Sequence, residues 1–157
     1  MITVYFCGAD ELDKYLESVL SRHICAPFEI LRTAEGKPYI EGNPVYFSKS
    51  HKKTRAAFAI SDKPVGIDME VLTGRERNSI LQRFSERERS EISCERDFLN
   101  HWTAREAFVK LYGYTLLNTY RRIEFYGGKI YLDGIVQQVK LESYSFENAQ
   151  ITVCLEQ

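Results

Sequence analysis

The pattern of apolar and polar positions predicts short strands alternating with a few helices. Period-two or short apolar runs predict strands over residues 2–7, 28–31, 39–40, 45–47, 55–60, 65–72, 121–126, 129–132, 136–144 and 149–155. Three- and four-residue spacing predicts helices over residues 11–23, 77–92 with a break near 84–85, and 95–112. The tight connection at 61–64 predicts a hairpin between strands 55–60 and 65–72.

Local signals mark several ends of these elements. Asp10 can cap the first helix, and Ser85 with Glu88 three residues later fits a capping box. Gly113 is placed to end the long helix, and the pair Gly127-Gly128 predicts a hairpin turn. The element order favours the α+β class, with two similar halves related by pseudo-two-fold symmetry. Each half would pack a helix on a small antiparallel sheet, with residues 1–64 and 65–157 forming one compact unit.

The strand over 65–72 places two carboxylates on one face, because side chains two residues apart on a strand point the same way. Asp68 and Glu70 form this pair, and the helix over 95–112 adds Glu106 with Lys110 one turn later. Taken alone, the pair also fits a solvated strand face, and Glu106 with Lys110 an ordinary helix pair. Apolar positions flank the Glu106–Lys110 strip, so we expect it to face a cleft. Three acids near cations suit a hard divalent ion that binds a phosphate.

Composition narrows the classes of protein. The chain has 157 residues, 44% hydrophobic, with a net charge of −1, which suits a globular protein and argues against general nucleic-acid binding. The four cysteines lack zinc-finger spacing, so we expect small buried apolar side chains with reduced thiols. The N-terminal segment lacks the features of a signal peptide, and no apolar run is long enough for a membrane helix. We therefore expect a cytoplasmic protein without a membrane or nucleic-acid partner.

A basic segment lies before the acid strand. Residues 48–55 hold four Lys or Arg side chains, two serines and His51, and Lys37 lies between the turn residues Gly36 and Pro38. Alone, the segment also fits a solvated basic loop. Together with Lys37 it places cations and hydroxyls before the acids, and such groups bind phosphates as fixed donors. The sequence has neither a P-loop nor a GxGxxG motif.

Four motifs in this order resemble the signatures of the 4′-phosphopantetheinyl transferases, the type that activates peptide and polyketide synthetases. They are Gly36-Lys-Pro38, Phe47-Ser-Lys-Ser-His51, Val65-Gly-Ile-Asp-Met-Glu70 and Trp102-Thr-Ala-Arg-Glu-Ala-Phe-Val-Lys110. Arg83-Phe-Ser85, followed by Glu88, is similar to the family segment between the acid strand and the signature helix. The family usually has Asn where this chain has Ser48 and Lys where it has Arg105, and its N-terminal half is usually longer.

The resemblance implies transfer of the phosphopantetheine arm of coenzyme A to a serine of an apo acyl or peptidyl carrier protein, with release of adenosine 3′,5′-bisphosphate. It implies that Asp68, Glu70 and Glu106 hold Mg²⁺ and that Lys110 contacts the pyrophosphate. Lys37, Ser50 and His51 would bind nucleotide phosphates, which makes residues 1–64 the nucleotide side and 65–157 the metal and carrier side.

Glu106 is the candidate general base, and Asp68 and Lys110 complete the catalytic set. We expect a monomer. Two other readings stay open: a non-catalytic relative that binds a carrier protein or a nucleotide, and a Mg²⁺-dependent phosphohydrolase.

Overall fold

The computed structural model describes residues 1–42, 45–74, 78–114 and 121–157. Its elements are β1 (Ile2–Gly8), α1 (Leu12–His23), β2 (Leu31–Arg32), β3 (Pro38–Tyr39), β4 (Tyr46–Lys52), β5 (Arg55–Ser61), β6 (Val65–Val71), α2 (Asn78–Leu81), α3 (Glu86–Ser90), α4 (Glu95–Tyr112), β7 (Ile123–Tyr126), β8 (Lys129–Leu132), β9 (Ile135–Val136), β10 (Val139–Phe146) and β11 (Ala149–Glu156). The α+β class predicted from the sequence is confirmed.

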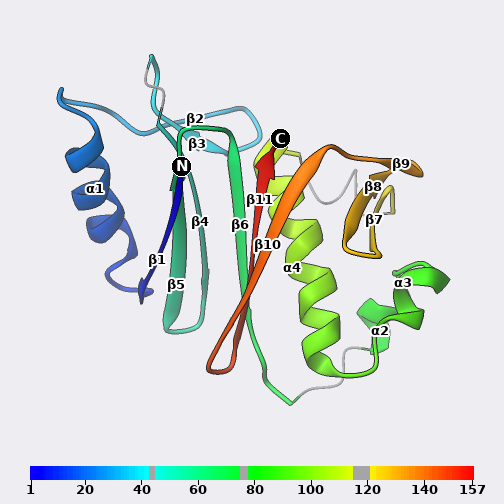
Figure 1. Cartoon of the computed structure of the whole chain (residues 1–157). Helices are drawn as coiled ribbons and strands as arrows, with labels where there is room; N and C mark the ends of the chain where they lie inside the picture. Colours follow the sequence, from blue (N-terminus) through cyan, green and yellow to red (C-terminus); the bar gives the residue numbers. More distant parts are fainter. Residues whose placement is uncertain (43–44, 75–77, 115–120) are drawn as a thin grey trace.

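Two three-stranded antiparallel sheets form the centre of the molecule, with strand orders β1-β5-β4 and β10-β11-β6. Helix α1 packs on the outer face of the first sheet through Leu16 and Leu20, and α4 packs on the second (Figure 1). The inner faces pack on each other, with Ala57 and Ala59 against Ile67 and other apolar side chains. The result is a helix–sheet–sheet–helix arrangement, in which the two-fold relation between the halves stays a prediction.

The hairpin predicted for strands 55–60 and 65–72 is wrong. β5 pairs with β1 and β4, whereas β6 pairs with β11 from the end of the chain. Ser61 still makes a tight connection, since its hydroxyl accepts a hydrogen bond from the Lys63 amide at 3.1 Å. The connection carries the chain from one sheet to the other, so β5 and β6 meet face to face through their side chains. The sequence pattern predicts that the two strands pair, because both segments are apolar and only a short connection separates them.

β4 is longer than predicted and includes most of the basic segment 48–55, which taken alone also fits a solvated loop. It runs from Tyr46 to Lys52 and forms a hairpin with β5 across a turn in which Lys53 has a φ of 55°. A smaller correction concerns α1, which begins after Glu11 with no side-chain cap from Asp10. The break predicted near 84–85 is present, because the short helices α2 and α3 lie on either side of it; residue 77 lies outside the described residues.

Helix α4 lies unusually close to β6 because of one glycine. A Cβ on Gly66 would lie 2.0 Å from the Ala107 carbonyl oxygen and 2.5 Å from the Leu111 amide nitrogen. Gly66 shares a strand face with Asp68 and Glu70, since these residues are two apart. The missing side chain therefore lets α4 approach the same face that carries the two acids.

A buried ion pair joins α3 to the back of α4. The predicted capping box is present: Ser85 Oγ accepts from the Glu88 amide, and the Glu88 carboxylate accepts from the Ser85 amide. The same carboxylate accepts from the Phe125 amide at 2.9 Å and from Arg105 Nη1 at 3.4 Å, and the side chains of Glu88 and Arg105 are at most 3% exposed. The Arg105 guanidinium also lies over the Phe84 ring. Arg105 therefore fixes α3 and β7 to α4.

Two further observations concern the class of protein. In the described part of the chain, no helix is long and apolar enough to cross a membrane. The four cysteines are free, as expected, but Cys25 and Cys94 are exposed, and burial raises the pKa of the Cys154 thiol to about 12.

Candidate active site

The two sheets meet along the edges of β4 and β6, and side chains of β4 make the contacts. Ser48 Oγ accepts from the Ile67 amide and Ser50 Oγ from the Met69 amide, each at 3.1 Å. Lys52 then reaches Glu70 at 2.9 Å. The three β4 residues are two apart, so one face of this strand runs along the whole acid strand. We call this junction the β4–β6 seam.

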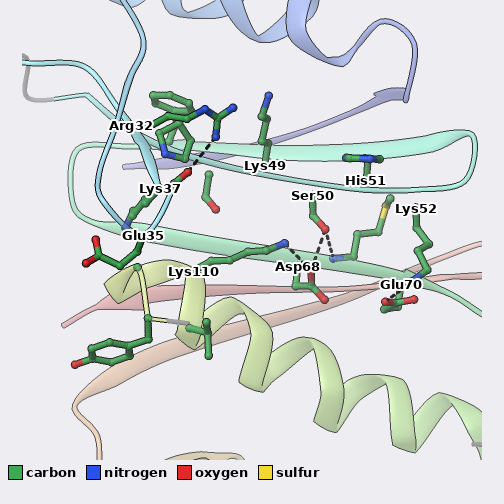
Figure 2. A pocket seen from close by; sticks show the side chains of 18 residues that line it. Arg32, Glu35, Lys37, Lys49, Ser50, His51, Lys52, Asp68, Glu70 and Lys110 are labelled. Carbon is green, nitrogen blue, oxygen red and sulfur yellow. Dashed lines mark hydrogen bonds and ion pairs between the residues drawn. The ribbon is translucent and has the colours of Figure 1, made fainter. Parts of the chain in front are cut away.

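A cleft of about 440 Å³ opens beside the seam. Figure 2 shows the acids on β6 facing the β4 side chains, with Arg32 and Lys37 at one end of the view and Lys52 at the other. The basic side chains that line the cleft are Arg32, Lys37, Lys49, His51, Lys52 and Lys110, and the acids are Glu35, Asp68 and Glu70. Such an excess of cations over a concave surface attracts a polyanion.

Each acid of β6 is held through one oxygen only. Asp68 Oδ1 accepts from Ser50 Oγ at 2.9 Å and from Lys110 Nζ at 2.7 Å. Glu70 Oε1 accepts from Lys52, whereas Asp68 Oδ2 and Glu70 Oε2 are buried and accept no hydrogen bond. A buried oxygen without a partner is costly, more so when it carries charge. The two free oxygens therefore suit a cation that would lie beside β6.

Glu106 lies close enough to Asp68 and Glu70 for their charges to affect its pKa. Burial raises the pKa of Glu106 to about 7, and the charges of Asp68 and Glu70 add to this rise, while Lys110 opposes it. Burial also raises the pKa of Asp68, against the hydrogen bonds and charge that Lys110 and Ser50 supply. The charges of Asp68 and Glu70 disfavour the ionised state of Glu106, and that of Glu70 also disfavours the ionised state of Asp68, which is a setting that a bound cation relieves.

These residues fit a magnesium ion that is completed by its substrate. Within the described ranges, no group of three or more His, Cys, Asp or Glu side chains is arranged to hold a metal ion by itself. Mg²⁺ is usually bound by one or two carboxylates, several waters and substrate phosphates, without a full protein cage. The pair of free oxygens on Asp68 and Glu70, with Glu106 nearby, matches this requirement.

Lys37 lies in the cleft but is bound to α4, which comes much later in the sequence. Its ammonium group donates to the Leu111 carbonyl oxygen in the last turn of α4, where a cation favours the helix dipole. Burial lowers the pKa of Lys37, and the charge of Glu156 opposes this shift. In this structure Lys37 thus caps α4, a contact that the sequence did not suggest.

The structure separates two residues that the sequence grouped together. Ser50 is buried in the seam, whereas His51 is exposed and follows it on the opposite face of β4. Lys52 is the partner of Glu70, a contact that the sequence did not suggest. The period-two pattern of Ser48, Ser50 and Lys52 is the signal that could have found it, but the surrounding cations favoured a loop.

The geometry agrees with a comparison against known families. The model of the 4′-phosphopantetheinyl transferase superfamily matches residues 64–154, more than half of the chain. The chain belongs to the 4′-phosphopantetheinyl transferase superfamily. A search of curated proteins found no match.

Family membership supports phosphopantetheinyl transfer as the general activity, with coenzyme A and a carrier protein as the implied partners. The match to the transferase model contains β6 with Asp68 and Glu70, and α4 with Glu106 and Lys110. It also contains Arg105, at the position where the family usually has lysine. Lys37, Ser50 and His51 precede the matched range, so their roles depend on the structure of the cleft.

Proposed function

We propose that this transferase moves the 4′-phosphopantetheine arm of coenzyme A to a serine of an apo acyl or peptidyl carrier protein in a Mg²⁺-dependent reaction. Adenosine 3′,5′-bisphosphate would be the second product. One observation carries the proposal beyond the family: Asp68 and Glu70 each keep a buried free oxygen beside a cleft lined by cations. A diphosphate needs both a cation and fixed positive side chains when its bridging bond breaks.

The residues divide into two groups in this proposal. Asp68, Glu70 and Glu106 would hold Mg²⁺, which neutralises charge on the diphosphate when bound. Lys110 pairs with Asp68 in this structure, so it lies beside the proposed metal site and would bind the diphosphate. Lys37 and His51 line the cleft from the N-terminal half, residues 1–64, and would bind the nucleotide phosphates.

The reaction would form one phosphorus–oxygen bond and break another. The carrier serine oxygen attacks the β-phosphorus, and the bond from this phosphorus to the bridging oxygen of the diphosphate breaks. Glu106, which lies beside Asp68 and Glu70, would take the serine proton as the general base. Lys110 would stabilise the negative charge that grows on the leaving bisphosphate.

The direct test is mass spectrometry of several apo carrier proteins incubated with the chain, coenzyme A and Mg²⁺. We expect a mass gain of one phosphopantetheine group on the carrier and none on a carrier whose acceptor serine is replaced by alanine. Equal release of adenosine 3′,5′-bisphosphate with and without a carrier would instead indicate a phosphohydrolase. Failure of every carrier to gain mass would contradict the proposal.

Magnesium should also stabilise the free chain. Ligand that binds only the folded state stabilises it by about 2.7 kcal/mol at 100 times its dissociation constant. We therefore expect Mg²⁺ to raise the thermal unfolding midpoint of the metal-free chain, and Asp68→Asn to abolish most of this rise. Glu147→Gln is a matched control, because Glu147 is exposed and pairs with Arg55 outside the cleft. Equal rises in the wild type and Asp68→Asn would exclude Asp68 as a ligand.

A further inference from the structure

The hydroxyl of Ser50 has its only proton committed in this structure. Ser50 Oγ donates to Asp68 Oδ1 at 2.9 Å and accepts from the Met69 amide at 3.1 Å. A serine hydroxyl has one donor and two acceptor positions. To donate to a phosphate, Ser50 would have to release Asp68. Its side chain is also buried in the seam, at 7% exposure.

Ser48 provides an internal comparison. It lies two residues earlier on the same strand face, is equally buried, and accepts from the Ile67 amide at 3.1 Å. Its backbone contact therefore repeats that of Ser50. The difference between them is the bond from Ser50 to the acid, which Ser48 does not make in the described structure. The pair thus separates the task of joining β4 to β6 from the task of holding Asp68.

We propose that Ser50 is a positioning residue that orients Asp68 toward the metal. The inference rests on the proposed function. Ser50 and Lys110 both donate to Asp68 Oδ1, which leaves the buried Oδ2 as the oxygen offered to a cation. Partners that orient a ligand in this way typically change metal affinity or activity by about 10- to 100-fold.

Ser50 and Lys110, the two donors to Asp68, would behave differently during the reaction. Lys110 carries a charge and is 31% exposed, so a bound diphosphate competes for it with Asp68. Ser50 is neutral and enclosed, and its second bond to the Met69 amide fixes it to the strand that carries Asp68. When Lys110 moves to the diphosphate, Ser50 remains as the donor that keeps the carboxylate in place.

The test compares Ser50→Ala with Ser48→Ala in the full metal-free chain. The measurement is the Mg²⁺ concentration that gives half of the maximal rise in thermal unfolding midpoint, with Mg²⁺ alone as the probe. We expect Ser50→Ala to raise this concentration about 10- to 100-fold. Ser48→Ala should lower the midpoint without Mg²⁺ and leave the Mg²⁺ concentration at the wild-type value. Ser50→Thr, which keeps the hydroxyl, should restore the wild-type Mg²⁺ response.

Each outcome decides the matter. Equal Mg²⁺ responses of Ser50→Ala and wild type would overturn the positioning role, and a raised KM for coenzyme A in that variant would show a phosphate contact instead. A wild-type chain that binds no Mg²⁺ would overturn the metal site and, with it, the role of Ser50. If wild type responds to Mg²⁺ but no carrier gains mass, the transfer proposal fails while the positioning role stands. If Ser50→Ala does not fold, Ser50→Cys replaces it, because a thiol has nearly the same shape but donates weakly.

Discussion

A chain carrying Glu106→Gln is expected to lose at least about 100-fold in transfer rate and yet fold at least as stably as the wild type without metal. A general base contributes about 10²- to 10⁴-fold, and the same change removes a proposed metal ligand. Stability should not fall, because glutamine keeps the shape of the side chain and removes a charge that burial and Asp68 disfavour.

The pH dependence of stability gives this prediction a second measurement. Glu106 has a pKa of about 7 in the folded chain, against an ordinary value of 4.5, so the folded state binds more protons between these values. The free energy of unfolding of the metal-free wild type should therefore decrease as the pH rises from about 4.5 to about 7. Urea unfolding across this range should show a smaller decrease for Glu106→Gln. Transfer at the wild-type rate by this variant would remove Glu106 from the mechanism.

Replacement of Gly66 by alanine is expected to disrupt both the fold and the site. The added Cβ would meet the Ala107 carbonyl oxygen at 2.0 Å, and the atoms in its way belong to the backbone of α4. No side-chain rotation can relieve this overlap, so the helix must move away from β6. Overpacking of a core costs about 1–3 kcal/mol and occasionally more, and we expect the upper end or beyond because backbone must shift.

The effect on transfer should exceed the effect on stability. Displacement of α4 moves Glu106 and Lys110 away from Asp68, and a shift of about 1 Å can cost about 100-fold in rate. Gly8→Ala is the matched control, because it is also a strand glycine and its new Cβ would meet only side-chain atoms, those of Asp10 and Glu11, and no backbone. Urea unfolding and the carrier assay should show a much smaller loss for the control. A Gly66→Ala chain as stable and active as Gly8→Ala would contradict the role of this close approach.

Elements with strong local signals could be predicted from the sequence. The long helix occupies residues 95–112 as predicted, and Gly113 ends it with a φ of 72° in the left-handed region. The capping box of Ser85 and Glu88 is present, and the Gly127-Gly128 turn joins β7 to β8. In each case the deciding interactions lie within a few residues of one another.

Pairing between distant segments could not be predicted. β6 pairs with β11, and nothing in the composition of residues 65–72 identifies that partner or excludes the adjacent strand β5. The Arg105–Glu88 pair also depends on how α3 meets α4, which a motif of helix residues does not encode. Sequence patterns report burial and local conformation, whereas the choice among apolar partners depends on the packing of the complete chain.

The candidate site was predictable in its residues more than in their roles. The structure places Asp68, Glu70, Glu106 and Lys110 near one another, as the strand and helix patterns indicated. The roles of the N-terminal residues differ more from expectation in the free chain. Lys37 donates to a carbonyl oxygen in the last turn of α4, and Ser50 donates to Asp68. Both contacts come from elements distant in sequence, so the sequence did not reveal them.

The β4–β6 seam has a mechanical consequence. Where neighbouring strands of one sheet share a backbone ladder, their separation is fixed at about 4.7–4.9 Å. Along the seam, Ser48 and Ser50 instead reach the backbone amides of β6 through their side chains. These two small uncharged side chains therefore set how closely β4 lies to β6 at the wall of the cleft.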